Sequence, residues 1–202
     1  LWFSARERVA SSDEFKRDVL GRYLEVRPGA LEFTENEHGK PALVGATRSL
    51  DFNLSHSGEW LVCAVTAGSP VGVDLEYCNP DRASLRVARR FFRQEEVAVL
   101  ESCDDSVMSQ RFYDFWTIKE AAVKARGEAL APGLSAHGFA LDFAGDEAGG
   151  TGAIALESAV PDDAHYLLLD PIVDYRVAVC CMGGAQQSLR MGLFELDDNG
   201  EA

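Results

Sequence analysis

The sequence predicts an α+β protein in which a similar arrangement of strands and helix occurs in each half. Three observations lead to this fold class. Strand-like segments occupy residues 51–75, helical spacing of apolar residues replaces them over residues 82–127, and strand-like segments return after residue 138. The chain has 202 residues, of which 47% are hydrophobic and 26% charged, so it has the composition of a globular protein and enough length for a core.

The first half begins with a helix and continues as an antiparallel sheet. Apolar residues such as Phe15 and Val19 recur among many charged residues at the start of the chain, which predicts an amphipathic helix that runs to about Tyr23. A short extended stretch at 31–33 and a turn at 37–41 follow. Three neighbouring strands are expected next, over residues 51–57, 61–66 and 71–75.

The second half is helical before it returns to strands. Helices are expected over residues 85–92, 95–100 and 106–126, the last of them stopped by Gly127. Strands are expected over residues 138–143, 152–158, 166–169 and 175–181. Residues 142–152, rich in glycine and acid, are expected to form a mobile loop.

Charge and cysteine usage narrow the class of protein. The 19 Lys and Arg residues face 33 Asp and Glu residues, a net charge of −14, which argues against nucleic acid and against an anionic membrane surface as partners. There is no apolar run of about 18 residues to span a membrane and no secretory pattern at the start. The five cysteines form no CxxC pair, which favours reduced thiols in a cytoplasmic protein.

Two carboxylates in the segment Val71–Glu76 are the first candidate site. Residues two apart on a strand share a face, so Asp74 and Glu76 lie side by side. A divalent cation relieves the repulsion between paired carboxylates, and an oxygen-only ligand set favours Mg²⁺, with Mn²⁺ possible. Taken alone, the segment is also compatible with ordinary solvated acids at a strand end.

The long predicted helix carries the second candidate site, in Trp116–Lys124. Glu120 and Lys124 are four residues apart and share a helical face. Two of the four lysines of the chain, Lys119 and Lys124, flank this carboxylate, an arrangement that suits a third metal ligand with cations for phosphate oxygens. A surface ion pair is the alternative interpretation.

The third candidate segment is Asn53–Ser57, with Gly39–Pro41 upstream. Its serine, histidine and lysine side chains could bind phosphate by hydrogen bonds and charge. A nucleophilic serine activated by His56 is disfavoured, since adjacent strand residues point apart and the chain has no G-x-S-x-G elbow.

Together these segments resemble the 4′-phosphopantetheinyl transferases of the surfactin-synthetase-activating type. The family signature is hydrophobic-Gly-hydrophobic-Asp, roughly forty residues of helix, and then Trp/Phe-Ser/Thr/Cys-x-Lys-Glu-Ala/Ser-x-x-Lys. This chain has Val71–Asp74, then 41 residues, then Trp116–Lys124, with the segments at 39–41 and 53–57 in the right order upstream. The resemblance implies two similar α+β lobes, related by a pseudo-two-fold axis, each an antiparallel sheet packed with helices. We place the lobes at 1–75 and 76–202, with a ligand cleft between them.

The implied reaction moves phosphopantetheine from coenzyme A to a serine of an apo acyl or peptidyl carrier protein and releases adenosine 3′,5′-bisphosphate. By the match, Mg²⁺ would be held by Asp74, Glu76 and Glu120. Glu120 would also be the base for the carrier serine, directly or through water, and Lys124 would assist by contacting phosphate.

The same match assigns coenzyme A contacts. Asp74, Lys119 and Lys124 would face the pyrophosphate, Ser55 and His56 the nucleotide phosphate, and Lys40 and Pro41 would border the adenine pocket. Family members usually have a longer basic N-terminal helix for the 3′-phosphate, so we expect residues to be missing before Leu1. The remaining candidates for that contact are Arg6, Arg17 and Arg22.

An arginine-rich segment is the candidate partner surface. Arg82, Arg86, Arg89 and Arg93 are three or four apart, which predicts one helical side that would dock an acidic carrier protein. A solvated helix face is the alternative. For the whole chain, a metal-dependent coenzyme A pyrophosphohydrolase and a silent coenzyme A-binding module remain alternatives, and the resemblance to two-lobe enzymes predicts a monomer.

Overall fold

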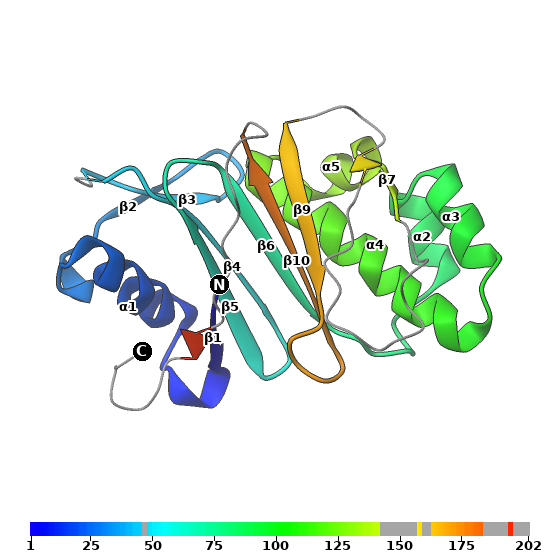
Figure 1. Ribbon diagram of the computed structural model, residues 1–202, viewed down its shortest axis with the longest axis horizontal. Coiled ribbons are helices and arrows are strands. Elements are labelled where there is room, and N and C mark those ends of the chain that lie inside the picture. The colour runs from blue at the N-terminus through cyan, green and yellow to red at the C-terminus, as the bar shows by residue number, and fades with distance from the viewer. Residues whose placement is uncertain (46–47, 142–156, 159–162, 184–193, 196–202) are drawn as a thin grey trace.

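The computed structural model describes residues 1–45, 48–141, 157–158, 163–183 and 194–195 (Figure 1). Two mainly antiparallel sheets lie side by side along the length of the molecule, and each has helices of its own. The mixed α+β class with antiparallel sheets is therefore as predicted. In the described part, no helix is both long enough and apolar enough to cross a membrane.

The first sheet has the order β11-β1-β5-β4. Its strands are β1 (Trp2–Ala5), β4 (Asp51–Ser57), β5 (Trp60–Thr66) and β11 (Phe194–Glu195). Helix α1 (Ser12–Leu24) buries Phe15 and Val19 against Trp2 and Leu61 of this sheet. A separate small hairpin follows α1, made of β2 (Phe33–Glu35) and β3 (Pro41–Leu43).

The second sheet has the order β6-β10-β9, from β6 (Val71–Tyr77), β10 (Tyr175–Met182) and β9 (Ala164–Leu169). Helix α4 (Asp105–Arg126) packs along it through buried residues such as Ile118 and Ala122. The remaining elements of this half are α2 (Leu85–Phe91), α3 (Gln94–Glu101), α5 (Leu130–Ala136), β7 (Phe139–Ala140) and β8 (Glu157–Ser158).

The two sheets share one connectivity. In the first, strand β1 leads to α1 and then to β4 and β5, and β5 pairs antiparallel with both β1 and β4. In the second, β6 leads to α4 and then to β9 and β10, and β10 pairs antiparallel with both β6 and β9. This repeat is what two similar lobes require. The pseudo-two-fold relation, the ligand cleft and the boundary after Leu75 stay predictions; β6, which spans that position, pairs within the second sheet.

The two sheets meet along β4 and β6, where side chains replace a backbone ladder. Backbone N–H groups of β6 donate to side-chain oxygens of β4: Val71 to Asp51 at 2.9 Å, Val73 to Asn53 at 2.9 Å and Tyr77 to Ser57 at 3.0 Å. Alternate residues of β4 share one face, so one row of polar side chains closes the outer edge of β6. We call this row the polar seam.

The prediction of a helix from the start of the chain is wrong. Trp2–Ala5 is a strand, a 3₁₀ turn covers Arg6–Arg8, and the helix begins only after Ser11, whose hydroxyl accepts the N–H of Glu14. Pairing of β1 with β5, some 60 residues away, overrides the local preference.

Helices α2, α3 and α4 and strands β4, β5, β6, β9 and β10 form near the expected residues, whereas strand β3 and helix α5 were not expected. Of the strands expected over residues 138–143 and 152–158, the structure describes Phe139–Ala140 as β7 and Glu157–Ser158 as β8. Residues 142–156, and with them the predicted loop at 142–152, lie outside the described residues. All five cysteines are free thiols.

Candidate active site

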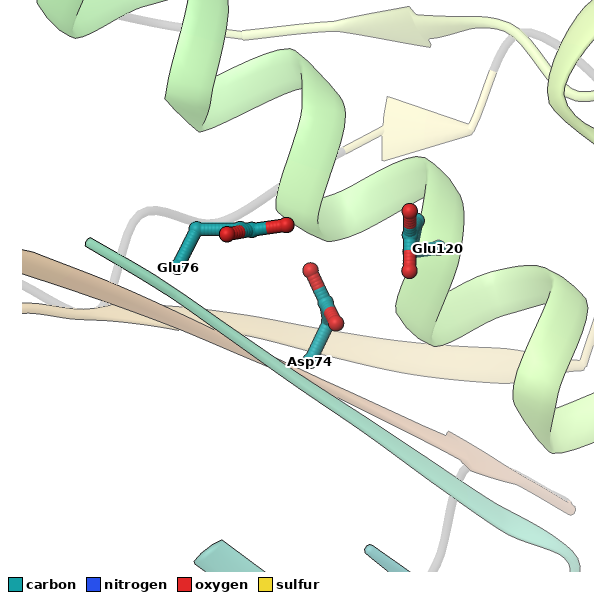
Figure 2. A group of neighbouring side chains, drawn as sticks. All are labelled: Asp74, Glu76 and Glu120. Atoms are coloured by element: carbon teal, nitrogen blue, oxygen red, sulfur yellow. The ribbon is translucent and has the colours of Figure 1, made fainter. Parts of the chain in front are cut away.

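Three carboxylates from β6 and α4 converge at the junction of the second sheet with its long helix. Asp74 and Glu76 project from β6, and Glu120 projects toward them from α4 (Figure 2). One oxygen from each lies within 4.8 Å of the others. The structure therefore brings together the three acids that the two motifs supply.

Gly72 permits this convergence. A Cβ atom at Gly72 would lie 2.0 Å from the carbonyl oxygen of Ala121 and 2.4 Å from the backbone nitrogen of Ala125. Only a residue without a side chain lets the strand approach the helix backbone so closely. The close approach, in turn, places Glu120 beside Asp74.

Lys124 is the cation of the site. Its ammonium donates to Asp74 Oδ1 at 2.5 Å and to Ser55 Oγ at 3.1 Å, and it lies 3.4 Å from Glu120 Oε2. Burial opposes the charge on Lys124, but the Asp74 and Glu120 carboxylates outweigh it and raise the pKa of the ammonium. Lys124 is therefore held in its charged form, chiefly by Asp74.

One lysine does not balance three carboxylates. Burial first, and then the Asp74 charge, raise the pKa of Glu120 to about 8, although Lys124 opposes the shift. Burial and Asp74 also raise the pKa of Glu76, against hydrogen bonds from Ser57 and Trp116. Both shifts come first from burial and then from the neighbouring Asp74 charge, which a bound cation would offset.

The residues fit a divalent cation. Asp74 is almost fully buried, and its Oδ2 atom has no hydrogen-bond partner among the described residues, whereas Oδ1 accepts from Ser55 and Lys124. A buried carboxylate oxygen without a donor is costly unless a ligand satisfies it. An all-oxygen donor set with surplus negative charge suits Mg²⁺ or Mn²⁺.

Lys119 does not join this group. Its ammonium is fully buried and donates to both carboxylate oxygens of Glu96, at 2.7 and 3.0 Å, and to the carbonyl of His137. Glu96 also accepts the backbone N–H groups of Arg93 and Phe139. The geometry thus gives no support to a phosphate contact by Lys119, which instead joins α4 to α3 and to the segment before β7.

The candidates upstream of β6 differ in whether they reach the carboxylates. Ser55 is buried and donates to Asp74 Oδ1 at 2.9 Å, whereas His56 is exposed and, as its neighbour on a strand, belongs to the opposite face. The Lys40 ammonium donates to Asp51 and to the backbone carbonyls of Val71 and Ala125. Val71 and Ala125 lie next to the close approach of β6 and α4 at Gly72. Pro41 begins β3 next to it.

The N-terminal arginines lie in the 3₁₀ turn and in helix α1, beside the first sheet. Arg17 donates to Asp13 at 2.6 Å and to the carbonyl of Leu31 at 2.7 Å, and Arg22 lies over the ring of Trp2 at 5.2 Å. Arg6 is exposed in the 3₁₀ turn. The structure brings none of the three to the carboxylates through a hydrogen bond or ion pair that it describes.

The predicted single arginine side is wrong in part. Helix α2 ends at Phe91, so Arg82 and Arg93 lie outside it. Arg93 is the N-cap residue of α3, and its guanidinium donates to the carbonyl of Ala136. Arg86 and Arg89 do share α2 and are exposed, and Arg89 pairs with Glu101 at 2.7 Å.

Three functional positions were missed by sequence reasoning: Gly72 as a contact glycine, Ser57 as a partner of Glu76, and Glu96 as a partner of Lys119. For Ser57 a signal existed, since it lies two residues from Ser55 and so shares its strand face. For Glu96 the spacing from Arg93 is that of a capping box.

Comparison with known proteins agrees with this geometry. A model of the 4′-phosphopantetheinyl transferase superfamily matches residues 70–180, which include all three acids and Lys124. The 4′-phosphopantetheinyl transferase Sfp of Bacillus subtilis is 30% identical over 176 residues, covering 86% of this chain and 73% of its own length.

Two further comparisons are more partial. The 4′-phosphopantetheinyl transferase HetI of a Nostoc species is 39% identical over 62% of this chain, and the chain spans about half of that relative, 54% of its length. A solved holo-(acyl-carrier-protein) synthase from Bacillus anthracis aligns with 57% of this chain and 96% of its own, at 16% identity and a TM-score of 0.45.

Proposed function

Because the chain belongs to the 4′-phosphopantetheinyl transferase superfamily, we propose that it transfers 4′-phosphopantetheine from coenzyme A to a serine of an apo carrier protein. Adenosine 3′,5′-bisphosphate is the other product, and the reaction depends on Mg²⁺. The observation that carries the proposal is the convergence of Asp74, Glu76, Glu120 and Lys124 within the matched residues.

The reaction is an attack of the serine oxygen on the phosphorus that bears the pantetheine arm. A new P–O bond forms, the bond to the bridging oxygen of the pyrophosphate breaks, and the electron pair leaves with the nucleotide. Mg²⁺ held by Asp74, Glu76 and Glu120 would neutralise charge on the pyrophosphate oxygens. Lys124, kept charged chiefly by Asp74, supplies a second positive charge beside them.

Glu120 is our candidate for the general base. Burial raises the pKa of Glu120 to about 8 in the metal-free site, and a divalent cation held beside it would favour the ionised carboxylate that can accept a proton. In the proposal this carboxylate accepts the serine proton, directly or through one water. No protein nucleophile is needed.

The proposed coenzyme A contacts are less directly supported. We retain Ser55 and His56 for the nucleotide phosphate and Lys40 with Pro41 for the adenine pocket, and Arg6, Arg17 and Arg22 remain candidates for the 3′-phosphate. Lys119 is left out, since Glu96 and the carbonyl of His137 occupy its ammonium.

The carrier protein is proposed to be acidic and to dock at the exposed arginines of α2, Arg86 and Arg89. Reversal of both to glutamate is then expected to raise the KM for the carrier with little change in kcat. An unchanged KM would remove this surface from the proposal. We further propose that the enzyme acts as a monomer in the cytoplasm.

Mass spectrometry of an apo carrier protein incubated with the chain, coenzyme A and Mg²⁺ tests the activity. We expect the carrier to gain the mass of phosphopantetheine, Glu120→Gln to abolish the gain while largely retaining coenzyme A binding, and the exposed Glu25→Gln to leave it unchanged. Hydrolysis of coenzyme A without carrier would favour a pyrophosphohydrolase. Binding without either reaction would favour a silent module.

A further inference from the structure

Two serines of the first sheet are matched to two acids of the second. Ser55 and Ser57 lie two residues apart on β4, as Asp74 and Glu76 do on β6. Ser55 Oγ donates to Asp74 Oδ1 at 2.9 Å and Ser57 Oγ donates to Glu76 Oε2 at 2.8 Å. Each acid of β6 is therefore held by a hydroxyl from the other sheet.

The direction of the Ser57 hydrogen bond follows from counting its donors. A serine hydroxyl has one hydrogen to donate and can accept from other groups. The backbone N–H of Tyr77 donates to Ser57 Oγ at 3.0 Å, which leaves the hydroxyl hydrogen for Glu76. Because Tyr77 belongs to β6 itself, the hydroxyl is fixed relative to the same strand that carries Glu76.

Fixing one oxygen of Glu76 restricts rotation of the whole carboxylate. The Trp116 side chain, from α4, also hydrogen-bonds Glu76. Glu76 is a long side chain and only half-buried, so it loses more rotamer freedom on ordering than Asp74 does. Groups that orient a metal ligand typically change metal affinity or activity by about 10–100-fold when removed.

We propose that Ser57 is a positioning residue for Glu76, which it orients toward Asp74 and Glu120 for the binding of a divalent cation. The inference rests on the proposed function, in which these three acids hold Mg²⁺. It makes metal affinity depend on a residue of the first lobe, although all three acids belong to the second sheet and its helix.

Direct binding of Mn²⁺ to the full chain, measured by electron paramagnetic resonance of the free ion, tests the proposal without any turnover. Ser57→Ala removes the hydroxyl and is expected to weaken Mn²⁺ binding about 10-fold. Ser57→Thr retains a hydroxyl in a residue that strands favour, and should bind within about twofold of the natural chain.

Asn53→Ala is the matched control. Asn53 accepts the N–H of Val73 in the same polar seam and has no described hydrogen bond to the three acids. It should lower the thermal unfolding midpoint yet leave Mn²⁺ affinity unchanged. If Asn53→Ala weakened Mn²⁺ binding as much as Ser57→Ala, the seam as a whole would be responsible and the role of Ser57 would be refuted.

Two other outcomes separate this inference from the proposed function. If the natural chain binds Mn²⁺ and the Mn²⁺ affinity of Ser57→Ala is within twofold of it, the positioning role is overturned and the proposed function is left intact. Natural chain that binds no Mn²⁺ would overturn both. Should Asn53→Ala not fold, the contrast between Ser57→Ala and Ser57→Thr still decides, because the two differ in the hydroxyl.

Discussion

Replacing Lys119 with methionine separates a structural role from a phosphate contact. The substitution keeps a long apolar stem and removes the ammonium from a pair in which Lys119 is 0% and Glu96 1% exposed. Removing one partner of a buried ion pair costs about 3–5 kcal/mol. Glu96 keeps the N–H groups of Arg93 and Phe139, at 2.7 and 2.8 Å, so we expect a loss near the lower limit, about 3 kcal/mol.

Thermal unfolding followed by circular dichroism measures this loss. For a chain of this size, 1 kcal/mol shifts Tm by about 2–4 °C, so Lys119→Met should unfold about 6–12 °C lower. The double variant Glu96→Gln/Lys119→Met removes the stranded charge and should recover part of the loss. A fall in Tm below about 2 °C, or a double variant no more stable than the single one, would refute the reasoning.

Kinetics of the same variant at a temperature well below its unfolding complete the test. If Lys119 only joins α4 to α3, the KM for coenzyme A and kcat should stay near those of the natural chain. A large rise in KM with the fold intact would restore the phosphate contact that the sequence motif implies.

Two further predictions concern the β6–α4 junction. Gly72→Ala places a Cβ 2.0 Å from the carbonyl oxygen of Ala121, which is backbone and cannot move aside easily. The substitution should lower the free energy of unfolding in urea by about 3 kcal/mol or more. Gly29→Ala is the control and should be nearly neutral, since a Cβ there meets nothing within 4 Å. Because the pKa of Glu120 is raised to about 8, its carboxyl is mainly protonated at pH 7, so Mn²⁺ binding there should release a proton and tighten as pH rises toward 8, measured by calorimetry in two buffers. Without metal, the folded state keeps a proton on Glu120 that the unfolded state loses above about pH 4.5, so stability should fall as pH rises from about 4.5 to about 8. Glu120→Gln should show neither effect, and Mn²⁺ binding without measurable proton release would contradict the assignment.

Local pattern was sufficient for the acids and insufficient for the lysine beside them. Two-residue spacing on a strand put Asp74 and Glu76 on one face, and four-residue spacing on a helix put Glu120 and Lys124 together. Successive helical residues are rotated by about 100°, so Lys119 faces a different neighbour from Glu120. Membership of one motif does not imply membership of one site.

What the sequence could not supply was the set of contacts between distant segments. Strand β1 forms because it pairs with β5, and no local preference in Trp2–Ala5 announces that partner. The bond from Ser57 to Glu76 requires β4 to lie along β6, although the two strands pair with different sheets. Such contacts depend on how the two sheets are placed, which periodicity does not encode.

The polar seam has a consequence for the integrity of the chain. A strand edge whose N–H groups are unpaired can pair with a strand of another chain, and proteins therefore cover such edges. Here Asp51, Asn53 and Ser57 of the first sheet accept N–H groups along that edge of β6 and so cover it. We therefore expect a fragment cut in the connection at residues 67–70 to aggregate edge to edge, and proteolytic nicking there to lead to precipitation rather than to two separate folded halves.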